Sequence, residues 1–144
     1  MFVAVCNMVG SFAGGWLVDR LSQSKLLTGL PLMSAIALSV LSIVDSGFAT
    51  LLCLGLVGLV YGAIIAAYPA VVAKLFGMTD GPRVYGRVFT AWGTAGLIAP
   101  WFAGYLFDYT GGYGVAITAA AAMSCASAVF AFVLFGSGRP KTVI

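Results

Sequence analysis

Long uncharged runs of mostly apolar residues fill this chain, and short charged stretches separate them. The runs cover residues 1–18, 26–44, 46–73, 88–107 and 109–138. Each is long enough for the roughly 20 apolar residues with which an α-helix crosses a bilayer. A membrane β-barrel would show segments of about 10 residues that alternate between apolar and polar, and these runs do not alternate. The pattern predicts an all-α membrane protein with five transmembrane helices, near residues 2–20, 26–44, 48–76, 86–108 and 113–136.

The composition excludes an ordinary soluble domain. Hydrophobic residues make up 62% of the chain and charged residues only 8%, whereas roughly 25% of the residues of a soluble domain are charged. We therefore expect the lipid bilayer to cover most of the surface. The seven basic residues are scattered and form no patch, so no nucleic-acid partner is expected.

The positions of the basic residues predict how the chain is oriented in the membrane. If the five spans alternate in direction, all of the basic residues fall on one side: Arg20, Lys25, Lys74, Arg83, Arg87, Arg139 and Lys141. By the positive-inside rule this side is cytoplasmic. We expect a multi-pass protein of the plasma or inner membrane, with its N-terminus outside and its C-terminus in the cytoplasm.

The residue types on which enzymes and metal sites depend are absent or dispersed. The chain has no histidine, and its three cysteines lie in separate apolar runs without Cys-x-x-Cys spacing. Neither a Gly-x-Ser-x-Gly motif nor a Gly-x-x-x-x-Gly-Lys motif is present. We therefore expect no enzymatic activity, no metal and no cofactor.

A short internal repeat indicates a transporter. The segments "GWLVD" at residues 15–19 and "GYLFD" at residues 104–108 share the pattern Gly-aromatic-Leu-x-Asp. Each ends a predicted span, but the first ends in the cytoplasm and the second outside. Two copies of opposite orientation indicate an inverted repeat, a construction typical of secondary transporters.

Three stretches resemble a known transporter family. The segment "GWLVDRLSQSK" at residues 15–25 resembles the cytoplasmic signature loop of the major facilitator superfamily: Gly15, Asp19, Arg20 and Lys25 match, and residues 22–24 depart from the pattern. The segments "YPAVVAKLFG" and "YGRVFTAWGTAGLIAPWFAGYLFDYTGGY" resemble the tenth and eleventh helices of its oxalate/formate antiporter and monocarboxylate transporter group. The resemblance implies that the five spans are helices eight to twelve of a twelve-helix fold. It therefore implies a fragment whose N-terminal half is missing.

The resemblance also implies a function, that of a secondary active antiporter or symporter with alternating access to a midplane site. Oxalate/formate antiporters hold a dicarboxylate with one basic residue in the eighth helix and one in the eleventh, and Ser11 and Trp92 stand at these positions here. The loss of both charges favours a small monocarboxylate-like organic anion over oxalate. The polar residues expected to line the cavity are Asn7, Ser11, Tyr61, Tyr68, Thr90, Trp92 and Thr94. Hydrogen bonding or packing between helices is an equally good interpretation of each.

The signature loop is predicted to act as a conformational switch through Gly15, Asp19, Arg20 and Lys25. A carboxylate at a helix end can bind a basic residue, or the positive N-terminus of another helix, in one conformation only. We expect the partner of Asp19 to lie in the missing half, and Arg83 and Arg87 to contact the signature loop of that half. The alternative for these residues is solvated charges that only fix the topology. The alternative for the chain is a non-transporting five-span membrane partner or assembly protein.

Overall fold

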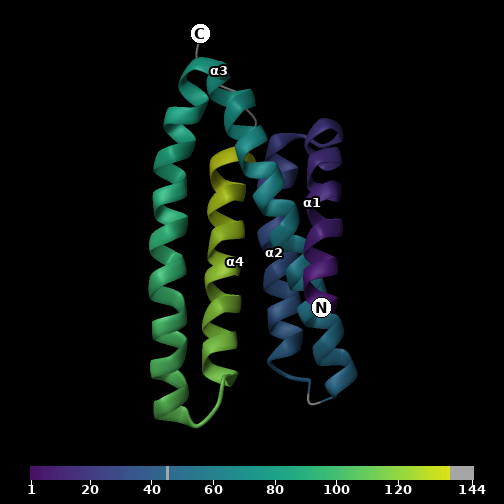
Figure 1. Cartoon of the computed structure of the whole chain (residues 1–144), viewed down its shortest axis with the longest axis vertical. Helices are drawn as coiled ribbons and strands as arrows, with labels where there is room; N and C mark the ends of the chain where they lie inside the picture. Colours follow the sequence, from purple (N-terminus) through teal and green to yellow (C-terminus); the bar gives the residue numbers. More distant parts are fainter. Residues whose placement is uncertain (45, 137–144) are drawn as a thin grey trace.

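The protein is a bundle of long helices (Figure 1). The computed structural model describes residues 1–44 and 46–136, and these contain no strand. The helices are α1 (Phe2–Arg20), α2 (Gln23–Leu41), α3 (Gly47–Thr110) and α4 (Gly114–Gly136). All four are long and apolar enough to cross a membrane. The prediction of an all-helical membrane protein is therefore confirmed.

The predicted number of helices is wrong, because α3 contains two of the expected spans. Its 64 residues form a first arm, residues 47–76, and a second arm, residues 78–110, with non-helical backbone angles only at Gly77. In Figure 1 the first arm runs to one end of the bundle, where the chain reverses and the second arm returns along the opposite side. The charged stretch at residues 74–87, expected to be a loop, is helical on both sides of this single residue.

The reversal depends on the backbone of Gly77. Its φ of 74° and ψ of 179° lie in a region that only glycine enters readily. We expect Gly77→Ala to lower the free energy of unfolding by roughly 1 kcal/mol or more. A Cβ at Gly77 would touch nothing within 4 Å, so the loss would come from the backbone alone.

The matched control for this prediction is Gly86→Ala, because Gly86 is helical and also has open space at the Cβ position. Alanine favours a helix over glycine, so this variant should be as stable as the parent protein or slightly more stable. Thermal unfolding of the two variants in detergent measures the difference. Equal melting temperatures would contradict the role assigned to Gly77.

Helix α1 and the first arm of α3 approach each other through glycines. A Cβ at Gly10 would collide with the backbone carbonyl of Leu59, and a Cβ at Gly62 with the backbone carbonyl of Asn7. A Cβ at Gly14 would lie 2.5 Å from the carbonyl oxygen of Ala63. Lipid tails are as apolar as leucine, so helices in a membrane associate mainly through such close van der Waals packing. This contact joins α1 to the rest of the bundle, because α1 packs mainly against α3.

A small core lies at the end of the bundle that holds the reversal. It combines residues from the last turns of α1, the first half of α2 and the first arm of α3: Val18, Leu26, Leu27, Leu30, Val60, Ala63, Ala67 and Val71. Helix α4 packs mainly against α2, and the second arm of α3 touches α4 only lightly. In the second arm only Gly81 is buried, so most of its surface is left to lipid or to other helices.

The described basic residues gather at the end of the bundle where α3 reverses. Arg20 ends α1, Lys25 lies in the first turn of α2, and Lys74, Arg83 and Arg87 flank Gly77. The arrangement agrees with the grouping expected from the sequence, and the side of the membrane that it faces stays a prediction. Arg139 and Lys141, which the same prediction used, lie outside the described residues.

Candidate functional site

The carboxylate of Asp19 has a partner within the chain. The ammonium of Lys74, near the end of the first arm of α3, lies 3.1 Å from Asp19 Oδ1 and donates to the Val18 carbonyl oxygen at 2.8 Å. Lys74 therefore neutralises the carboxylate and also satisfies one of the free carbonyls at the C-terminus of α1. The sequence analysis did not predict this partner, which is in reach because the first arm of α3 ends beside the end of α1. A contact of Asp19 with the missing half stays a prediction.

The ion pair is accessible to solvent, since the side chains of Lys74 and Asp19 are 44% and 78% exposed. Exposed pairs of this kind contribute about 0–1 kcal/mol to stability. A contribution of that size is small for holding a fold together. It is enough to shift the populations of two conformations, if the contact exists in only one of them.

Of the other signature residues, Gly15 and Arg20 lie in the last turns of α1 and Lys25 in the first turn of α2. The guanidinium of Arg20 lies over the ring of Trp16, with its Cζ 4.7 Å from the ring centroid. Lys25 is exposed, and a Cβ at Gly15 would touch nothing within 4 Å. Of the four predicted switch residues, only Asp19 is ion-paired to another element in the described part of the chain.

Two of the predicted cavity residues lie in the contact between α1 and the first arm of α3. The Ser11 hydroxyl is within hydrogen-bond distance of two backbone carbonyls, 3.1 Å from that of Asn7 and 3.3 Å from that of Gly62. Ser11 therefore ties α1 to α3 where the two backbones are closest. On the first arm, Tyr68 packs half-buried against the core, and Tyr61 is 41% exposed.

The remaining predicted cavity residues lie on the second arm of α3. The hydroxyl of Thr90 donates to the Arg87 carbonyl at 2.7 Å, and that of Thr94 to the Thr90 carbonyl at 2.8 Å. Trp92 stacks on Phe89, with 5.0 Å between the ring centroids. In Figure 1 the second arm and α1 lie on opposite sides of the bundle. The described helices thus place the seven residues in two separate groups rather than around one cavity.

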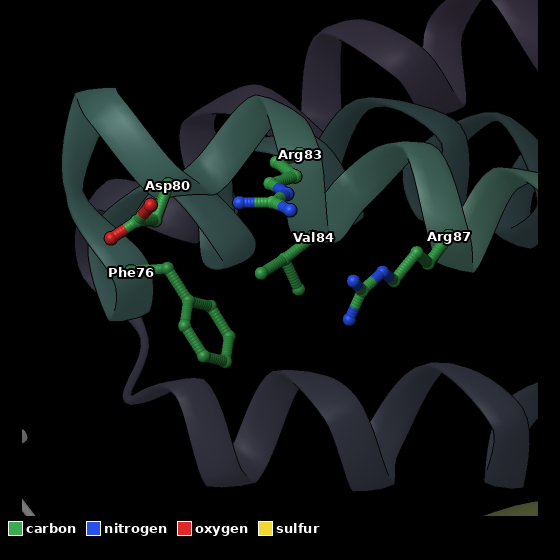
Figure 2. A pocket seen from close by; sticks show the side chains of 5 residues that line it. All are labelled: Phe76, Asp80, Arg83, Val84 and Arg87. Carbon is green, nitrogen blue, oxygen red and sulfur yellow. The ribbon is translucent and has the colours of Figure 1, made fainter.

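An open hollow of about 370 Å³ lies at the reversal of α3, lined by Phe76, Asp80, Arg83, Val84 and Arg87 (Figure 2). None of the seven predicted cavity residues lines it. The spacing of Arg83 and Arg87, four residues apart, places them one helical turn from each other. Phe76 lines the hollow only because the chain reverses at Gly77, and the sequence did not reveal this reversal.

Within residues 1–44 and 46–136 no group of three side chains is suited to hold a metal ion.

Apolar helices of membrane-spanning length, with the described charged side chains at helix ends and at the reversal of α3, define a multi-pass membrane protein. The sequence matches the family model described as Major Facilitator Superfamily over residues 1–143, and the chain belongs to that family. No functionally curated protein and no solved structure matches the chain. The superfamily resemblance is therefore confirmed. The oxalate/formate or monocarboxylate subgroup and the numbering of the helices stay predictions.

Proposed function

We propose that the chain is part of a secondary active transporter that moves a small organic anion, similar to a monocarboxylate, across the cell membrane by alternating access. Membership of the major facilitator superfamily is the observation that carries the proposal. The internal repeat at residues 15–19 and 104–108 supports it, because inverted repeats are common in secondary transporters.

Open space beside the glycines of the second arm of α3 supports the proposal that other helices pack there and share the transport path. A Cβ added at Gly93, Gly96 or Gly104 would meet nothing within 4 Å, in contrast to Gly10 and Gly14 of α1. Small residues on membrane helices allow close helix contacts. We propose that further helices of the same transporter pack against this arm, and that the two sets of helices rock about a site near the middle of the membrane.

The distribution of charge supports a monoanion as the solute. Apart from the reversal in α3, the described charged residues lie at or next to helix ends, so the middle of each apolar segment is neutral. A charge within the hydrocarbon core is costly and usually marks an ion site. Ser11 and Trp92, which align with basic residues of oxalate/formate antiporters, are both neutral. A doubly charged solute would therefore lack a counter-charge from this chain.

Uptake into liposomes tests the proposal. The full-length transporter, reconstituted in liposomes, should take up labelled lactate and exchange it for unlabelled lactate, with little uptake of oxalate. Trp92→Ala should reduce lactate uptake severalfold if Trp92 lines the path. Trp101→Ala is the matched control, because Trp101 lies on the same arm and is 71% exposed. Preferred uptake of oxalate would contradict the monoanion, and absence of uptake of any small carboxylate would contradict the solute class.

A further inference from the structure

Two arginines at the reversal of α3 have no ionic partner in the described part of the chain. Arg83 and Arg87 are both exposed, and the one ion pair among residues 1–44 and 46–136 joins Lys74 to Asp19. Both line the open hollow. Two guanidinium groups one turn apart attract an anion, and guanidinium is the side-chain group best shaped to bind phosphate through two hydrogen bonds.

The hollow combines this positive charge with an apolar wall. In Figure 2 the guanidinium of Arg87 and the side chains of Val84 and Phe76 face the same space. Asp80 also lines the hollow, but its carboxylate points away from Arg87. Two arginines and one aspartate leave a net charge of +1 around the hollow. The ligand that fits is an anion attached to an apolar group.

The position of the hollow along the chain identifies the source of such a ligand. Its residues, 76–87, lie between the uncharged runs 46–73 and 88–107, which belong to the two arms of α3. The reversal therefore lies at the boundary between the apolar core of the membrane and water, at the end of the bundle that carries the basic residues. Lipid phosphates occupy this depth, and basic pockets at the cytoplasmic ends of membrane helices bind anionic lipid headgroups.

We propose that the hollow at Gly77 binds the phosphate of an anionic phospholipid. Arg87 holds the phosphate, Arg83 adds positive charge on the side of Asp80, and Phe76 and Val84 contact the apolar part of the lipid. The bound lipid would fix the reversal of α3 at a defined depth in the membrane. This site is separate from the path of the transported solute, and it requires only that the chain resides in a membrane.

Lipid binding is measured on the purified full-length protein in nanodiscs of phosphatidylcholine that contain increasing fractions of phosphatidylglycerol. Native mass spectrometry counts the phosphatidylglycerol retained on the protein. We expect Arg83→Gln and Arg87→Gln each to weaken retention about fivefold and the double variant about thirtyfold, because a basic residue at the membrane surface contributes roughly 1 kcal/mol. Lys25→Gln is the matched control, since Lys25 is exposed at the same end of the bundle but does not line the hollow.

Each outcome decides the proposal. Weaker retention in the arginine variants, with unchanged retention in Lys25→Gln, supports a lipid site in the hollow. An equal loss in Lys25→Gln would show a diffuse surface charge and overturn it. Displacement of the lipid by millimolar inorganic phosphate would show a site for free anions instead. Unchanged lipid retention together with lost transport would assign the arginines to a contact with other helices of the transporter, and would also overturn the proposal.

Discussion

Replacing Gly10 by alanine should force α1 away from the first arm of α3 and lower the free energy of unfolding by about 1–3 kcal/mol. The new Cβ would overlap the backbone carbonyl of Leu59, which, unlike the end of a flexible side chain, cannot rotate aside. Gly62→Ala should have a similar effect, because its Cβ would overlap the backbone carbonyl of Asn7. The double variant should lose more than either single variant but less than their sum, since the first substitution already widens the gap.

Gly15→Ala and Gly29→Ala are the controls for this prediction. Both glycines lie within helices, and a Cβ at either position would touch nothing within 4 Å. Alanine should therefore be neutral or slightly stabilising at both. Titration with SDS in mixed micelles gives the unfolding free energies of all the variants. If Gly10→Ala unfolded at the same SDS fraction as Gly15→Ala, the close backbone contact would not exist in the folded protein.

Moving α1 away from the first arm of α3 should also break the hydrogen bond between Ser11 and the Gly62 carbonyl. The Ser11 hydroxyl reaches the Gly62 carbonyl at 3.3 Å only because the two backbones are so close. A shift of the helices by a fraction of an ångström breaks this hydrogen bond before it opens the rest of the bundle. Ser11 is thus part of the glycine contact between α1 and the first arm of α3.

The helical class of the fold follows from hydrophobicity, but the number of helices does not. Apolar runs report where the chain is inside the lipid, and charged residues report where it leaves. The charged stretch at residues 74–87 does leave the apolar core, which is why a loop was expected there. Helical hydrogen bonding nevertheless continues on both sides, and the chain reverses at Gly77 alone. A one-residue reversal has no hydrophobicity signal of its own.

Asp19 could be singled out from the sequence, but its contact with Lys74 could not. The sequence placed Asp19 and Lys74 on the same side of the membrane, as the structure does at one end of the bundle. Which of the five described basic residues pairs with Asp19 depends on how α1 and the first arm of α3 cross, and the glycines of both helices determine that crossing. The hollow depended on the reversal at Gly77 and was missed for the same reason.

Neutralising the carboxylate in Asp19→Asn should slow transport by the full-length protein about two- to tenfold while membrane insertion and folding stay intact. The expected range corresponds to ~0.4–1.4 kcal/mol, the scale of an exposed ion pair at a helix end. The pair joins the end of α1 to the end of the first arm of α3, so a motion that separates these ends must break it. Lys74→Met should have the larger effect, because it also removes the donor from the Val18 carbonyl.

Exchanging the two charged residues distinguishes the effect of the ion pair from the effect of the hydrogen bond to the Val18 carbonyl. In the double variant Asp19→Lys with Lys74→Asp the ion pair can form again, but aspartate has no proton to donate to the Val18 carbonyl, so transport should recover only in part. Lys74→Arg keeps both the charge and the donors and should be close to the parent protein. Asp108→Asn is the matched control, since Asp108 holds the same place in the internal repeat but has no ion pair in the described part of the chain. Equal slowing in Asp108→Asn, or no recovery in the reversed pair, would show that the contact between Asp19 and Lys74 does not control the transition.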